Sequence, residues 1–201
     1  TLANDGELRE ENGRWEIVGD PTEVSLIVAA RKVKADRKIK RYTRVGEIPF
    51  TSERKRMSII AKDSTDSDKL TVFAKGAPDV LLSYCTRIRV GGQVRKLTEG
   101  DRQSILATVE RLSSEAYRTL GEACRPLETG SLADVPGVSV NAAGQVSDIA
   151  DQAEAIETDL IWNGMVGIID PPRTEVRDSV TEAHRAGIRT VMITGDHPLT
   201  A

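Results

Sequence analysis

The sequence predicts a mixed α/β (α+β) fold in which helices flank an antiparallel β-sheet, followed by a shorter β-α-β segment. Short β-rich segments alternate along most of the chain with segments of helical periodicity, which is typical of such domains. Aromatic residues make up only 3% of the 201 residues, so the core must consist mainly of Val, Ile, Leu and Ala. The length is enough for one domain of ordinary size and part of another.

A strand and a helix are predicted first along the chain. Residues 15–18 (WEIV) have strand-forming side chains and follow a polar, charged approach. Asp20 is a suitable N-cap and Pro21 suits the first helical position, so a helix is expected over residues 20–34. The basic stretch that follows leads into strand-like residues 42–48.

Two hairpins are predicted next. Residues 57–61 and 70–74 are β-rich and are separated by a polar loop. Residues 88–90 and 93–95 flank two glycines, a turn signal that indicates a second hairpin. Pro78 opens a short helix between the two hairpins.

A longer helix and an acidic region come after the second hairpin. Thr98, with Asp101 three residues later, resembles a capping box, and apolar residues then recur at helical spacing. Residues 118–124 are expected to form a strand. Residues 126–159 are small and acidic, so we expect a loop with one acidic helix. The carboxylates of residues 148–159 are expected to form a solvated face, because they lack the loop pattern of a calcium site.

The C-terminal residues have the pattern of a parallel β-α-β unit. Residues 160–169 are largely apolar, a helix is expected over residues 174–186, and residues 188–193 form a second apolar segment. That segment ends in residues 194–196 (TGD), and ligands of parallel sheets bind at the carboxyl ends of strands. We expect a domain boundary near Asp170 and a second domain that is cut short in this sequence.

Charge and cysteine content exclude several classes of protein. The 28 basic and 31 acidic residues give a formal net charge of −3, so no overall field would hold a nucleic acid. The basic residues 31–44 are interrupted by Asp36 and include only Tyr42 as an aromatic residue, so a solvated helix end and an edge strand are expected. Cys85 and Cys124 lack the spacing of a disulfide scaffold or zinc site and are expected to be buried thiols.

One aromatic residue close to several cations suggests a nucleotide site. Neither a P-loop nor a dinucleotide-binding glycine motif occurs, so a nucleotide would have to be held in another way. Phe50 offers a flat apolar wall for a purine, while residues 54–56 (RKR) and Lys75 offer cations for phosphates. These residues leave one alternative open, in which Phe50 belongs to the core and the basic residues form a solvated turn.

Five short motifs occur in the order that is found in P-type cation-transporting ATPases, and their wording resembles the calcium-pump-like branch of that family. The motifs are GDPTE (19–23), FTSERKRMS (50–58), KGAPD (75–79), DPPR (170–173) and TGDHPLTA (194–201). The resemblance implies that residues 1–168 are most of the nucleotide-binding (N) domain. It implies that residues 169–201 begin the second half of the haloacid-dehalogenase-like phosphorylation (P) domain. ATP and Mg²⁺ are the ligands that it implies.

The resemblance also assigns nucleotide-binding roles. Phe50 would stack on adenine, and Glu23 would meet the amino edge of the base. Lys55 and Lys75 would lie toward the phosphates. The remaining contacts are expected from Gly76, which would let the ligand approach the backbone, from Arg118 and Leu120, and, after domain closure, from Arg173.

Position 52 departs from the family pattern. Many calcium-pump relatives carry an arginine there, near the phosphates, whereas Ser52 has no charge. Either Arg54 or Arg56 would have to supply that contact, or the contact is missing.

The last motif would act beside the phosphorylated aspartate of the pump. Thr194, Gly195 and Asp196 are the catalytic candidates, because Thr194 would donate to a phosphoryl oxygen and Asp196 would help to position the Mg²⁺-bearing phosphates. The family's acceptor motif, Asp-Lys-Thr-Gly-Thr, does not occur in this sequence. This chain alone is therefore not expected to hydrolyse ATP, and no metal site is assigned to its own residues.

The resemblance implies a cytoplasmic domain of an integral plasma-membrane cation pump. Its partners would be ATP and the pump's own phosphorylation and actuator domains, with membrane contact only through segments outside this sequence and no nucleic-acid partner. Two alternatives remain. A soluble haloacid-dehalogenase-like phosphotransferase would need an Asp-x-Asp-x-Thr-like loop that the sequence lacks, and a regulatory module would bind nucleotide without catalysis.

Overall fold

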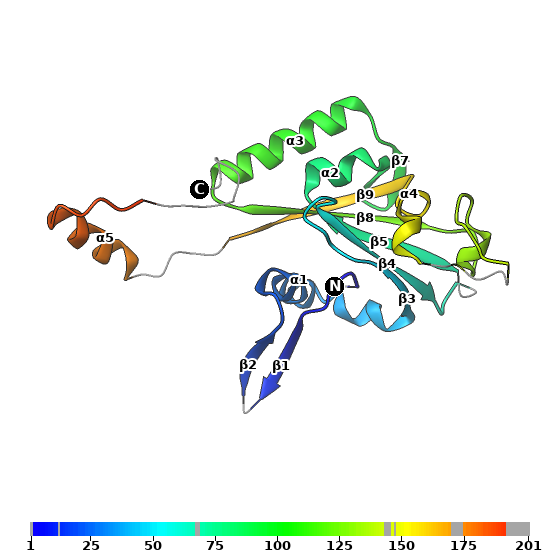
Figure 1. Ribbon diagram of the computed structural model, residues 1–201, viewed down its shortest axis with the longest axis horizontal. Helices are drawn as coiled ribbons and strands as arrows, with labels where there is room; N and C mark the ends of the chain where they lie inside the picture. The colour runs from blue at the N-terminus through cyan, green and yellow to red at the C-terminus, as the bar shows by residue number, and fades with distance from the viewer. Residues whose placement is uncertain are drawn as a thin grey trace.

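The computed structural model describes residues 2–11, 13–66, 69–142, 146, 148–169 and 175–191. This part of the chain forms a two-stranded and a seven-stranded β-sheet, with helices on both faces of the larger one (Figure 1). The strands are β1 (Glu7–Glu11), β2 (Arg14–Val18), β3 (Tyr42–Ile48), β4 (Arg56–Asp63), β5 (Leu70–Gly76), β6 (Cys85–Val90), β7 (Gln93–Lys96), β8 (Arg118–Pro126) and β9 (Leu160–Ile168). The helices are α1 (Pro21–Lys32), α2 (Pro78–Ser83), α3 (Glu99–Ser114), α4 (Ala153–Ile156) and α5 (Val176–Arg185), with 3₁₀ turns η1 (Asp36–Arg41), η2 (Leu132–Asp134) and η3 (Ala150–Gln152).

The seven-stranded sheet confirms the predicted fold class. Its strand order is β3-β4-β5-β8-β9-β6-β7. Neighbouring strands run antiparallel except for β9 and β6, which run parallel. The basic stretch after α1 leads into β3, which lies at one edge of the sheet as expected.

The predicted β-α-β unit is wrong in one respect. Its first strand, β9, lies inside the seven-stranded sheet between β8 and β6. The helix of that unit is present as α5, but residues 188–191 form no strand, and residues 192–201 lie outside the described residues. Leu160, Ile161 and Trp162 are all buried, because β9 is a central strand covered on both faces. Such a strand has the same continuous apolar pattern as a strand of a parallel sheet.

Local sequence signals predicted most other elements correctly. The Asp20 carboxylate accepts hydrogen bonds from backbone N–H groups of the first turn of α1. Thr98 and Asp101 form the expected capping box at the start of α3. β1 and η1 were not predicted. Residues 7–11 (ELREE) of β1 are mostly charged and have no apolar face that would indicate a strand. The described part of residues 126–159 forms short 3₁₀ turns, the four-residue α4 and an isolated β-bridge between Val140 and Val146, in agreement with the predicted loop and its one helix.

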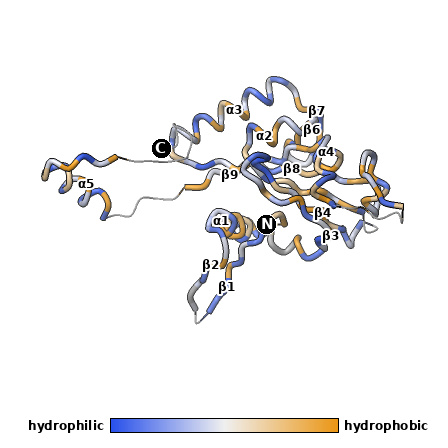
Figure 2. The backbone as a smooth tube through the Cα atoms, in the orientation of Figure 1, coloured by the Kyte–Doolittle hydropathy of each residue, from blue (hydrophilic) through white to orange (hydrophobic). Residues whose placement is uncertain are grey.

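The two faces of the large sheet are covered by different parts of the chain. Apolar residues concentrate along its strands (Figure 2). On one face Ala74 and Trp162 pack with Leu81 and Leu82 of α2. On the other face Ile59 belongs to a cluster with the N-terminal segment, which leads into the hairpin and α1. Since side chains alternate along a strand, neighbouring residues of β4 and β5 belong to different environments.

The two cysteines are free and buried, as expected. Burial raises the pKa of the Cys85 thiol to about 12, so this group stays protonated and is a poor nucleophile at neutral pH.

The end of β5 requires a glycine because the backbone of β4 lies very close. A Cβ atom on Gly76 would lie 2.6 Å from Cβ of Arg56 and 2.6 Å from the carbonyl oxygen of Lys55. Gly76→Ala should therefore lower the free energy of unfolding by about 1–3 kcal/mol, because the strands must separate. Gly92→Ala is the matched control, since its Cβ would meet no atom within 4 Å. Urea unfolding measures both, and equal midpoints for the two variants would show that β4 can move aside.

The capping box at α3 predicts a pH dependence of stability. The Asp101 carboxylate accepts hydrogen bonds from the Arg95 guanidinium and from Thr98, and these bonds lower the pKa of Asp101 well below its usual value. A lowered folded-state pKa adds stability above the unfolded-state pKa of about 3.9, and this stability is lost as the pH falls toward the folded-state pKa. Wild type should thus exceed Asp101→Asn in stability at pH 7, and denaturant titrations near roughly pH 3 should show a smaller difference. A difference that is independent of pH would contradict this assignment.

Candidate functional site

An ion pair joins the first turn of α1 to the end of β5. Nζ of Lys75 lies 2.6 Å from Oε1 of Glu23, and Oε2 of Glu23 accepts a hydrogen bond from the backbone N–H of Asp5. Lys75 is only 9% exposed, so most of its hydrocarbon chain is packed while its ammonium group contacts the carboxylate. The structure thus brings together two of the predicted nucleotide-binding residues.

Lys75 also lines a cavity on the α1 side of the sheet. The cavity has a volume of about 230 Å³, and its lining includes Leu26 of α1, Phe73 and Lys75 of β5, Glu122 of β8 and Asn163 of β9. Charged, polar and apolar side chains share this lining.

The loop between β3 and β4 carries Phe50 and Lys55. Phe50 is 60% exposed, so the alternative that places it in the core is wrong. Lys55 has a φ of +52°, a conformation that non-glycine residues adopt only when their surroundings fix it. Its N–H donates to the carbonyl of Thr51 (2.8 Å), and its carbonyl accepts from the N–H of Ala77 (3.0 Å), just after β5. The loop is therefore attached to the strand end that carries Lys75 and Gly76.

The fold itself requires a glycine at position 76, because Arg56 and Lys55 approach its Cα closely. It pairs with Gly121 of β8, so Leu120 lies beside the same strand end. Arg118 begins β8, and its charge contributes to lowering the pKa of Asp20, whose largest cause is the hydrogen bond from the Thr22 side chain.

Four predicted site residues lie outside the described residues. They are Arg173, Thr194, Gly195 and Asp196. Within the described residues, no three or more His, Cys, Asp or Glu side chains gather in a way that could hold a metal ion.

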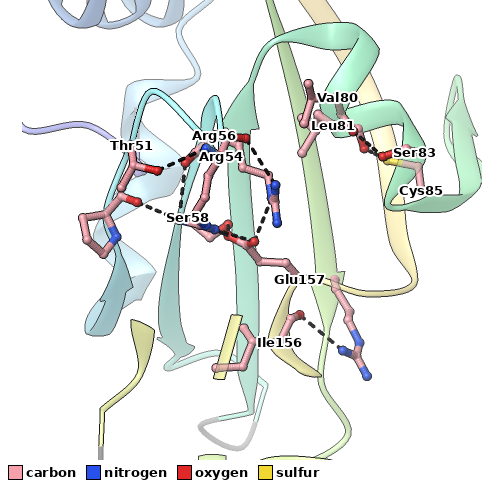
Figure 3. A network of polar contacts seen from close by, with 12 residues as sticks. Thr51, Arg54, Arg56, Ser58, Val80, Leu81, Ser83, Cys85, Ile156 and Glu157 are labelled. Carbon is pink, nitrogen blue, oxygen red and sulfur yellow. Dashed lines mark hydrogen bonds and ion pairs between the residues drawn. The ribbon is translucent and has the colours of Figure 1, made fainter. Parts of the chain in front are cut away.

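The opposite face of the sheet holds a polar network that the sequence analysis missed (Figure 3). Glu157 is completely buried, so the expectation of a solvated acidic face over residues 148–159 is wrong at this position. Its carboxylate accepts hydrogen bonds from Nη2 of Arg54 (2.5 Å to each oxygen), Nε of Arg56 (2.8 Å) and Oγ of Ser58 (2.6 Å). The guanidinium of Arg56 also lies 3.9 Å from the ring centroid of Tyr84.

This network overturns the prediction of a solvated basic turn. The side chain of Arg56 is 7% exposed and that of Arg54 is 23% exposed. Both guanidinium groups are bound to Glu157 in this structure. The sequence offered no spacing signal for Glu157, because its partners lie about a hundred residues earlier in the chain.

Comparison of the sequence with known proteins identifies one family. Residues 1–175 match the family model described as "P-type ATPase, cytoplasmic domain N". The chain is 40% identical over its whole length to a calcium-transporting ATPase of Bacillus cereus and 36% identical to one of Bacillus subtilis. It is 37% identical, over 95% of its length, to a sodium/potassium exporting P-type ATPase of Schizosaccharomyces pombe.

The chain spans about a fifth of the length of these relatives, at 20%, 20% and 17%. None of the helices in the described part of the chain is long and apolar enough to cross a membrane. Relatives whose names give different cations are similar to the chain at nearly the same identity, so identity alone does not assign an ion. The family match and these identities confirm the resemblance seen in the sequence motifs, and the chain belongs to the P-type cation-transporting ATPases, with residues 1–175 matching their cytoplasmic N domain.

Proposed function

We propose that this chain binds ATP beside the ends of β4 and β5 and presents it for phosphorylation of an aspartate outside this sequence. The observation that carries the proposal is the meeting of Glu23, Lys75 and the Lys55 loop at one strand end, with the exposed ring of Phe50 on that loop. In the whole pump this phosphorylation would drive cation transport, and the domain would lie on the cytoplasmic side of the membrane.

The chemistry of the site suits a nucleotide that must be released. Phe50 would stack on the adenine ring, and such stacking contributes about 1–3 kcal/mol. Glu23 would accept a hydrogen bond from the amino group of the base. Lys75 and Lys55 would act as point charges for the phosphates, and Arg118 and Leu120 would complete the pocket. Tight binding of ATP in the ground state would not accelerate phosphoryl transfer, so weak binding fits delivery to another domain.

The Glu23–Lys75 ion pair defines the arrangement of this site before a nucleotide binds. In this structure the ammonium of Lys75 contacts a carboxylate, so a phosphate that binds there competes with Glu23 or shares the cation with it. Because both side chains are partly exposed, replacing Glu23 by a phosphate as the partner of Lys75 would not leave a fully buried charge without a partner.

The remaining steps would involve the C-terminal residues and other domains of the pump. Mg²⁺ would arrive with the phosphates of the nucleotide and would neutralise charge that develops during transfer. Thr194, Gly195 and Asp196 would lie beside the acceptor aspartate, and Arg173 would reach the nucleotide after domain closure. The phosphorylation and actuator domains are therefore the proposed partners. The separate phosphotransferase alternative depended on a β-α-β unit that ends in residues 194–196; residues 188–191 form no strand, and residues 192–201 lie outside the described residues.

Titration of the purified chain with ATP and with AMP tests this proposal. Wild type should bind ATP with a Kd of about 0.1 to several mM, measured by NMR shifts or calorimetry. Phe50→Ala should weaken the binding of both nucleotides about 5- to 150-fold, because stacking involves the shared base. Lys75→Met keeps the packed stem but removes the charge, so it should weaken ATP more than AMP.

The control variant is Val94→Ala, because Val94 is exposed on β7 at the opposite edge of the sheet from β3. Its affinity for both nucleotides should equal that of wild type. If Phe50→Ala and Lys75→Met also bind both nucleotides as tightly as wild type, the residue assignments are refuted. Absence of ATP binding to wild type at concentrations about tenfold above the stated range would refute the proposed function.

A further inference from the structure

Glu157 is placed where it can control the loop that carries Phe50 and Lys55. All the described donors to its carboxylate come from residues 54–58, at the end of that loop and the start of β4. The backbone of Glu157 is itself fixed, because its N–H donates to the carbonyl of Ala153 (2.8 Å) in α4. Arg125 of β8 in turn donates to the carbonyls of Ala155 (2.8 Å) and Ile156 (3.2 Å), which attaches α4 to the sheet.

The two arginines extend this control over the whole loop. Nη1 of Arg54 donates to the carbonyl of Pro49 (2.7 Å), where the loop begins. Nη1 of Arg56 donates to the carbonyl of Arg54 (3.2 Å), where the loop ends. The two guanidinium groups therefore bind one carboxylate and both ends of the loop. Phe50 lies between these two carbonyls, and Lys55 lies between the two arginines.

Charge balance explains why a carboxylate is needed at this place. Two guanidinium groups beside one buried point repel each other, and holding them there without a counter-charge is strongly unfavourable. Without the negative charge of Glu157, the arginines would move toward water and take the loop with them. The φ of +52° at Lys55 shows that the loop conformation depends on such external support.

We propose that Glu157 is a positioning residue for nucleotide binding, which holds the loop of Phe50 and Lys55 in its binding conformation through Arg54, Arg56 and Ser58. This inference rests on the proposed ATP site. Glu157 itself would not touch the nucleotide, because it is completely buried on the other face of the sheet from the Glu23–Lys75 pair. If only a tenth of the molecules keep the loop in place, the apparent Kd rises tenfold.

The matched control is Asp101→Asn. Asp101 also accepts hydrogen bonds from an arginine and a hydroxyl group, Arg95 and Thr98, but it lies at the start of α3. Glu157→Gln and Asp101→Asn therefore remove the same kind of charge from two places. Ser58→Ala is a milder variant that removes one donor and leaves the charges of Arg54, Arg56 and Glu157 in place.

The experiment measures amide hydrogen exchange in the nucleotide-free chain and Kd for ATP and AMP, by NMR. In Glu157→Gln we expect faster exchange at the N–H groups of Arg54, Lys55 and Ala77, together with a Kd that is about tenfold higher for both nucleotides. Ser58→Ala should raise Kd about two- to threefold. Asp101→Asn should leave Kd and these amides unchanged.

Each outcome decides one question. A Glu157→Gln variant with wild-type exchange at these amides and a Kd within about twofold of wild type overturns the positioning role. If Glu157→Gln does not fold, a Ser58→Ala variant with wild-type Kd and exchange overturns it. If wild type binds neither nucleotide, the proposed function fails, and the exchange measurements alone still decide whether Glu157 holds the loop.

Discussion

The buried carboxylate of Glu157 is the interaction on which the arrangement of the site depends. It joins the end of α4 to β4 and the loop before β4, which lie about a hundred residues earlier in the chain. A buried carboxylate is tolerated only when its oxygens are satisfied, and here two arginines and a serine satisfy them. Arg56 and Ser58 share one face of β4, because residues two apart along a strand do so, and Arg54 reaches the same carboxylate from the loop.

The sheet separates two kinds of charge pairing. On one face, Arg56 is bound to a carboxylate with no exposed surface and lies over Tyr84, so this pairing is shielded from solvent. On the other face, Lys75 contacts Glu23 while both keep some contact with solvent. The strands that carry them are neighbours, since Met57 pairs with Lys75 and Arg56 with Gly76. A solvent-shielded ion pair thus lies on the strand next to the partly exposed Lys75, on the opposite face of the sheet.

The sequence predicted well whatever depends on residues that lie close together in the chain. The capping box of Thr98 and Asp101 spans three positions, and the second hairpin turns on two adjacent glycines, so their patterns are visible without the fold. The Glu23–Lys75 pair spans 52 positions and the Glu157 network about a hundred, and no local pattern encodes such contacts. The partner strands of β9 were predicted wrongly for the same reason, because an apolar run shows burial but not which strands lie beside it.

The position of β9 has a consequence for how the chain folds. β3, β4, β5 and β8 form one part of the sheet and β6 and β7 another, and β9 alone pairs with both parts. Until residues 160–168 have left the ribosome, β8 and β6 would each present an unpaired edge, which is the kind of surface that promotes aggregation. β9, the last strand of the sheet along the chain, thus joins its two parts. The sheet can form in full only after the segment of residues 160–168 has been synthesised.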